Sequence, residues 1–144
     1  MALNTIIAGS LIAVFAGLAL IHIYWLFGGR VEQLAAIPEL DGKLIFESTP
    51  LATLMVAIGL GLCTLLIAGT AGMLALPFAQ AVLAWMTHGL AMVLLLRAIG
   101  DFRLVGSFKQ IRDTRFARLD TTLYSPLCLV LAIGAAIISF TAHV

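Results

Sequence analysis

The sequence predicts an all-α integral membrane protein, a bundle of four transmembrane helices in a single domain. The 144-residue chain is 62% hydrophobic and 10% charged, whereas a soluble domain is about half apolar and about a quarter charged. Its eight basic and seven acidic side chains all fall in two windows, residues 30–47 and 97–120. A charge at the bilayer centre costs about 2.5–3.5 kcal/mol, so the uncharged stretches are expected to cross the membrane.

Each uncharged stretch is long enough to cross a bilayer, which takes about 20 apolar residues. The stretch between the two charged windows is too long for one span, and we divide it at Pro77 because proline disrupts a helix interior. The predicted spans are Thr5–Phe27, Pro50–Ala75, Phe78–Ile99 and Pro126–His143.

Helix-end signals accompany these spans. Thr49-Pro50 and Ser125-Pro126 each place a hydroxyl at the N-cap and a proline at the first helical position, which is the preferred order. The two signatures also suggest that each half of the chain repeats a helix, a charged loop and a capped helix. Chance similarity between apolar helices is the alternative explanation.

Four spans put both charged windows on one side of the membrane. All eight Lys and Arg residues are then on that side. The positive-inside rule makes this side cytoplasmic and leaves both termini outside.

The two cysteines, Cys63 and Cys128, fall at different depths in their predicted spans. A disulfide requires Cα atoms closer than about 7 Å. We therefore expect two free thiols.

Few polar groups lie in the spans, and such groups are functional candidates. We expect a pocket that opens to the charged side, with His22 or His88 as hydrogen-bond partner or general acid or base. Asp101 would orient Arg97 there. The ligand-binding candidates are Trp25, Arg97, Asp101 and Arg103. Structural roles are the alternative: a histidine bonded to a helix carbonyl, a tryptophan at the interface, or an arginine that reaches towards the headgroups.

Two histidines on different helices also permit haem bound through His22 and His88, because bundles hold haem by side chains of facing helices. No cluster of His, Cys, Asp or Glu has metal-ligand spacing, so no bare metal site is expected.

Basic residues alternate with apolar ones in the second charged window, at Lys109, Arg112, Arg115 and Arg118. This mixture suits a segment in the headgroup layer that contacts anionic lipid or a partner protein. A solvated loop that only fixes topology is the alternative, and nucleic-acid binding is not expected. Small residues four apart, at Ala57/Gly61, Ala68/Gly72 and Ala132/Ala136, predict close helix packing inside the bundle or in a homo-oligomer.

Two blocks of sequence resemble a known family. They are Arg97–Arg103 (RAIGDFR) and Tyr124–Leu129 (YSPLCL), and His22, Trp25 and Gly28-Gly29 agree with them. They are similar to small bacterial four-span membrane proteins that share a domain of unknown function. The resemblance supports an integral membrane protein of four helices and implies no activity, substrate or cofactor. We expect this bundle to lie in the bacterial inner membrane.

Three functions stay open. The first is binding of an amphipathic or lipidic molecule in the polar pocket, by an enzyme or a binding protein. The second is an accessory subunit that docks through the basic segment. The third is a small oligomeric transporter, for which His88 is the only mid-depth titratable candidate.

Overall fold

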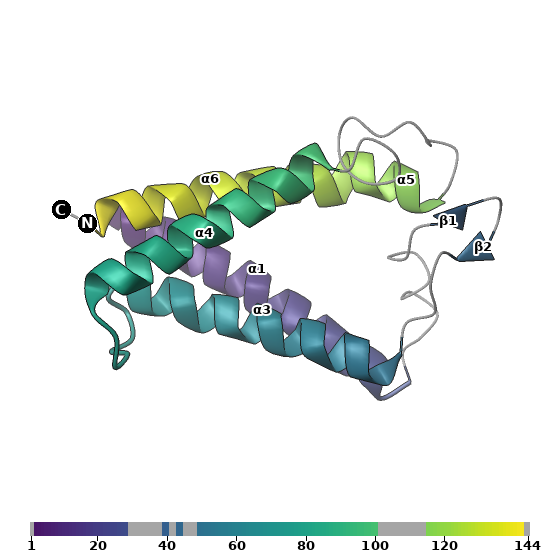
Figure 1. Ribbon diagram of the computed structural model, residues 1–144, viewed down its shortest axis with the longest axis horizontal. Coiled ribbons are helices and arrows are strands. Elements are labelled where there is room, and N and C mark those ends of the chain that lie inside the picture. The colour runs from purple at the N-terminus through teal and green to yellow at the C-terminus, as the bar shows by residue number, and fades with distance from the viewer. Residues whose placement is uncertain (1, 29–38, 41–42, 45–48, 101–114, 143–144) are drawn as a thin grey trace.

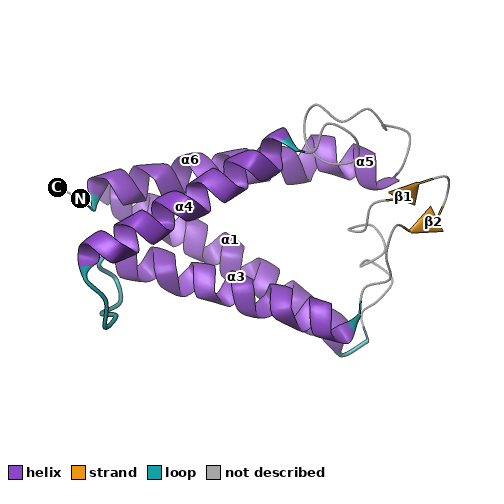
Figure 2. Ribbon diagram, in the orientation of Figure 1, coloured by secondary structure: helices purple, strands orange, loops and turns teal. Residues whose placement is uncertain are grey.

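Four long helical segments make up the protein. The computed structural model describes residues 2–28, 39–40, 43–44, 49–100 and 115–142. Four helices in these ranges are long and apolar enough to cross a membrane, which confirms the predicted all-α membrane bundle (Figures 1 and 2). They are α1 (Ala2–Leu26), α3 (Pro50–Thr70), α4 (Gln80–Ile99) and the run of α5 (Arg115–Leu119), η2 (Asp120–Tyr124) and α6 (Ser125–Thr141). Outside them, β1 (Glu39–Leu40) and β2 (Lys43–Leu44) form a short antiparallel pair.

The helices are arranged as two antiparallel pairs. Helix α1 packs along α3, and α4 packs along α6, with smaller contacts of α1 with α6 and of α3 with α4. Figure 1 shows that the pairs converge at the end that holds both termini and diverge towards the end where α1 and α4 finish. We call the latter the charged end, because Arg97 and Arg118 lie there.

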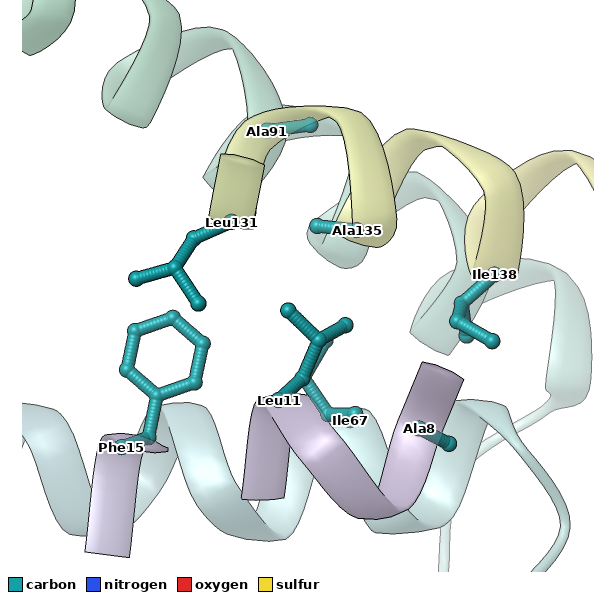
Figure 3. Close-up of a cluster of buried hydrophobic side chains, with 8 residues drawn as sticks. All are labelled: Ala8, Leu11, Phe15, Ile67, Ala91, Leu131, Ala135 and Ile138. Carbon is teal, nitrogen blue, oxygen red and sulfur yellow. The ribbon is translucent and has the colours of Figure 1, made fainter. Parts of the chain in front are cut away.

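The core lies where the two pairs converge (Figure 3). Ala8, Leu11 and Phe15 recur along one face of α1 at helical spacing. They meet Ile67 of α3, Ala91 of α4, and Leu131, Ala135 and Ile138 of α6. Most other large apolar side chains are exposed, as a surface in contact with lipid requires.

Helix α3 begins as predicted and ends earlier. Thr49 is extended and its side chain accepts a hydrogen bond from the Ala52 N–H, with proline next in the chain. The helix ends at Thr70 rather than Ala75, because Gly72 takes a positive φ of 71°. The Met73 N–H then bonds to the Ala68 carbonyl and the Gly72 N–H to that of Gly69, which is a Schellman cap. The predicted Ala68/Gly72 packing pair is therefore wrong, since Gly72 lies beyond the helix.

The fourth helix does not begin at Ser125-Pro126, and that prediction is wrong. The chain is helical from Arg115, and Ser125 lies inside the helix with its N–H bonded to the carbonyl of Asp120, five residues earlier. A proline ring in an α-helix clashes with the carbonyl four residues before it. The wider π-helical turn before Pro126 gives that ring room and keeps the helix continuous.

Buried hydroxyl groups join α3 to α4 at the end opposite the charged one. The hydroxyl oxygens of Thr70 and Thr87 are 2.7 Å apart, and Gln80 Nε2 donates to the Thr70 carbonyl at 2.7 Å. Such bonds between helices hold membrane bundles together. Elsewhere in the spans, Cys63 and Cys128 are both free thiols, as predicted.

Candidate functional site

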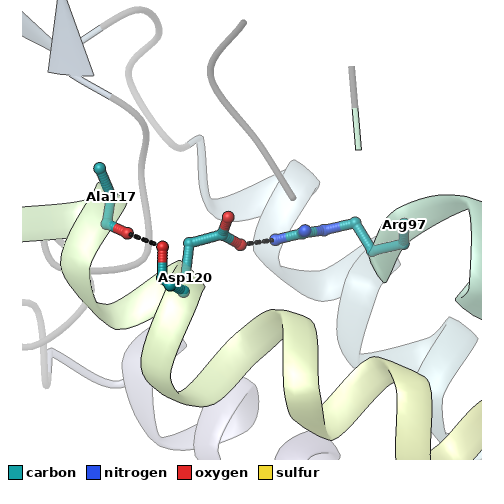
Figure 4. Close-up of polar contacts among 4 residues, drawn as sticks. Arg97, Ala117 and Asp120 are labelled. Atoms are coloured by element: carbon teal, nitrogen blue, oxygen red, sulfur yellow. Dashed lines mark hydrogen bonds and ion pairs between the residues drawn. The ribbon is translucent and has the colours of Figure 1, made fainter. Parts of the chain in front are cut away.

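An ion pair lies at the charged end of the bundle. Arg97, in the last turn of α4, donates from Nη2 to Oδ1 of Asp120 at 2.9 Å (Figure 4). The Asp120 side chain is 0% exposed, and that of Arg97 is 34% exposed. The pair joins the end of α4 to the start of the π-helical turn.

The π-helical turn positions the Asp120 carboxylate. In a turn of this kind the backbone bonds to the fifth residue rather than the fourth, so some carbonyl groups lose their usual N–H partner. Two threonine hydroxyls also bond to carbonyl groups one turn earlier: Thr121 donates to Ala117 at 3.1 Å and Thr122 to Arg118 at 2.9 Å. The sequence thus stabilises the turn with its own side chains.

Two buried polar atoms beside this ion pair have no hydrogen-bond partner among the described residues. One is Nη1 of Arg97 and the other is the hydroxyl oxygen of Ser125, whose residue is 1% exposed. Ser125 lies one turn beyond Asp120, to which its N–H is bonded. Leaving a buried donor or acceptor unpaired costs about 1–3 kcal/mol, so proteins seldom keep such groups without a use. One of the two atoms belongs to a guanidinium N–H donor and the other to a hydroxyl group.

Arg97 is a predicted site residue, but Asp120 is its partner in the described part of the chain. The predicted partner, Asp101, lies outside the described residues, as do Arg103, Lys109 and Arg112. Arg115 begins α5, and Arg118 of the same helix is exposed.

Helix α1 carries two predicted residues in contact with each other. The His22 and Trp25 rings are 4.8 Å apart. His22 Nδ1 lies 2.8 Å from the Leu18 carbonyl, so Nδ1 carries the proton and His22 bonds to its own helix. The Trp25 indole nitrogen is a third buried atom that has no hydrogen-bond partner in the described part of the chain.

His88 lies away from the ion pair. It precedes Arg97 on α4 by more than two turns, roughly 14 Å at 1.5 Å per residue, and its ring contacts Trp85 and Phe140. His22 lies four residues before the end of α1, whereas His88 lies eleven residues before the end of α4. Haem bound through both histidines, which requires them at facing positions, stays a prediction. No group of three potential metal ligands occurs among the described residues.

Sequence reasoning missed Asp120 and Ser125 as site residues. A helix start at Ser125-Pro126 placed Asp120 in a loop. A signal was present, because Phe116, Ala117 and Asp120 follow helical spacing and are all buried on one face of the extended helix.

A family model described as "Protein of unknown function (DUF3995)" matches residues 15–135 of the chain. No curated protein and no solved structure gives a significant match.

Proposed function

The chain belongs to the DUF3995 family of proteins of unknown function, and from this premise we propose a function based on its own geometry. It is a membrane protein that binds a lipid-soluble molecule at the charged end. An oxygen atom of that molecule accepts from Arg97 Nη1 and meets the Ser125 hydroxyl. The observation that carries the proposal is the pair of buried, unpartnered polar atoms beside one ion pair.

The charges at the site favour a neutral ligand oxygen over an anionic one. Asp120 already matches the positive charge of Arg97, at 2.9 Å. A second buried negative charge would need a partner of its own, since an unpaired charge in a dry site costs several kcal/mol. A carbonyl or hydroxyl oxygen needs only the remaining N–H and the hydroxyl.

The proposal is for binding rather than catalysis. His22 bonds to its own helix and His88 lies more than two turns from Arg97, so neither is placed to move a proton at the site. The ligand's apolar part would lie in the surrounding lipid. That lipid is already needed to cover the exposed apolar side chains of the helices.

Ser125→Ala tests the proposal, because it removes one unpartnered group and no side-chain hydrogen bond among the described residues. The variant is expected to unfold at the same or a slightly higher temperature, since an unsatisfied buried hydroxyl disfavours folding. Native mass spectrometry of the wild type in mild detergent should show one bound non-protein mass per chain, and Ser125→Ala should lose most of it.

Ser10→Ala is the matched control, because the Ser10 hydroxyl bonds to the Ile6 carbonyl within α1 and the variant should keep the bound mass. Two results contradict the proposal. One is a wild-type protein without any bound mass. The other is Ser125→Ala with the wild-type occupancy.

A further inference from the structure

A hollow lies between α4 and α6, away from the ion pair. Its volume is about 250 Å³, and it is lined by Trp85 and His88 of α4 and by Ser139 and Phe140 of α6. We propose that this hollow binds the ring of a lipid-soluble compound that carries a carbonyl or hydroxyl oxygen, such as a quinone, through His88. This site is separate from the proposed function at Arg97.

His88 is the polar group of the hollow that has no hydrogen-bond partner among the described residues. The Ser139 hydroxyl already has a partner, because it donates to the Ala136 carbonyl at 2.8 Å. An imidazole has one N–H donor and one acceptor nitrogen when neutral. His88 is half-buried within a candidate membrane span, where lipid tails offer it no partner. A ligand oxygen or hydroxyl would supply one.

Aromatic side chains form the walls around His88. The Trp85 ring is 6.1 Å from the imidazole at an angle of 77°, and the Phe140 ring is 5.2 Å away at 79°. Trp85 is 68% exposed and Phe140 62%, so both present ring surface on which a flat ligand can stack. Anchoring at the membrane interface accounts for Trp85 and Phe140, but it gives no role to His88.

The size of the hollow favours a ligand whose ring lies inside it and whose alkyl chain lies outside. Pockets that enclose a whole drug-sized ligand measure about 300–1,000 Å³, and this one is smaller. It therefore takes a ring-sized head, while an attached alkyl chain stays in the bilayer.

A hydrogen bond between α4 and α3 holds the α4 wall of the hollow in place. Thr87, next to His88 in α4, is fully buried and hydrogen-bonded to Thr70 of α3. This bond limits rotation of α4, so His88 is directed at α6 before any ligand arrives. A preformed site loses less entropy on binding than one that must be ordered.

The two tryptophans of the chain allow a direct test. In a Trp25→Phe background, Trp85 is the sole tryptophan and reports on the hollow. Titration of this protein in detergent with decylubiquinone should quench the Trp85 fluorescence along a saturable curve. His88→Leu in the same background should raise the apparent Kd at least tenfold, whereas His88→Gln, which keeps a donor and an acceptor, should recover part of the affinity.

Ser10→Ala in the Trp25→Phe background is the matched control, because the Ser10 hydroxyl bonds within α1 and does not line the hollow, and it should bind decylubiquinone like its parent. Circular dichroism should show the parental helix content in each variant. Linear quenching without saturation in the parent means simple partition into the micelle and overturns the proposal. Saturable quenching that His88→Leu leaves unchanged overturns it as well.

Discussion

Arg97 and Asp120 are expected to contribute unequally to the stability of the protein, because only one of them can reach water. The Arg97 side chain is partly exposed, and a long arginine stem lets the guanidinium turn towards headgroups. The Asp120 carboxylate is fully buried and short. Removing the cation therefore takes the ion-pair partner from a buried charge, whereas removing the anion leaves a cation that can still reach water.

This asymmetry predicts that Arg97→Met is more harmful than Asp120→Asn. Loss of one partner of a buried ion pair costs about 3–5 kcal/mol, and we expect Arg97→Met to lower the unfolding free energy by about 3 kcal/mol on that basis. Asp120→Asn keeps the shape and one acceptor oxygen, so its loss should be smaller. Denaturant unfolding in detergent micelles, followed by circular dichroism, measures both. Arg118→Met, at an exposed position of α5, should change little, and a larger loss in Asp120→Asn would contradict the argument.

At the residue scale the sequence identifies candidate groups better than their partners. A charged residue at the end of a span is conspicuous, which is how Arg97 could be singled out. Spacing of three residues on a helix also predicts local neighbours, and His22–Trp25 and Trp85–His88 are in contact. The Arg97–Asp120 pair joins residues 23 positions apart. Local periodicity carries no information about such a contact, since it depends on which helices pack together.

At the element scale, the two similar sequences Thr49-Pro50 and Ser125-Pro126 adopt different structures. Thr49 is exposed, extended and caps α3, whereas Ser125 is buried within a continuous helix. The difference lies upstream, where Phe116, Ala117 and Asp120 already follow helical spacing before Ser125. A hydroxyl followed by proline therefore indicates a helix start only where the preceding residues lack that spacing. The end of α3 can be recognised in the same way, because Gly72 precedes Pro77, where we divide the two spans.

Close packing of α6 against α1 should depend on Gly134. A Cβ atom added there would lie 3.1–3.4 Å from three side-chain atoms of Leu11, whereas nothing lies within 4 Å of a Cβ added at Gly59 in α3. Overpacking of a core typically costs about 1–3 kcal/mol, and we expect Gly134→Val to destabilise the protein by that amount. Gly59→Val is the matched control and should be close to neutral. Unfolding in detergent compares them, and equal losses would show that helix propensity rather than packing governs both.

At the scale of the whole molecule, the number of spans was predictable and their pairing was not. The bilayer requires every backbone polar group to be bonded within its own segment, so charge-free apolar stretches of sufficient length become helices. The pairing of α1 with α3 and of α4 with α6 depends on side-chain fit across the core. The two pairs repeat one plan, a helix, a loop at the charged end and a returning helix. Any two antiparallel helix pairs follow such a plan, so the repeat that the sequence suggests stays a prediction.

The orientation of the bundle follows from where its charges gather. The described ends of the chain and the turn between α3 and α4 lie at one end of the bundle, and Arg97 and Arg118 lie at the other (Figure 1). Because Lys and Arg in short loops are retained on the cytoplasmic side, we predict that the charged end faces the cytoplasm. Alkaline phosphatase fused after Val144 should then be active, since it folds only outside the cytoplasm, and green fluorescent protein at the same position should be dark.

Fusions after Gly100, at the end of α4, provide the reciprocal control and should show the opposite pattern. If the green fluorescent protein after Val144 is bright instead, the charged end faces outwards. The Arg97–Asp120 site would then receive its ligand from the outer leaflet, and the His88 hollow, which lies nearer the other end of α4, would open to the inner one. The reporter pair therefore also decides from which side of the membrane each proposed site is filled.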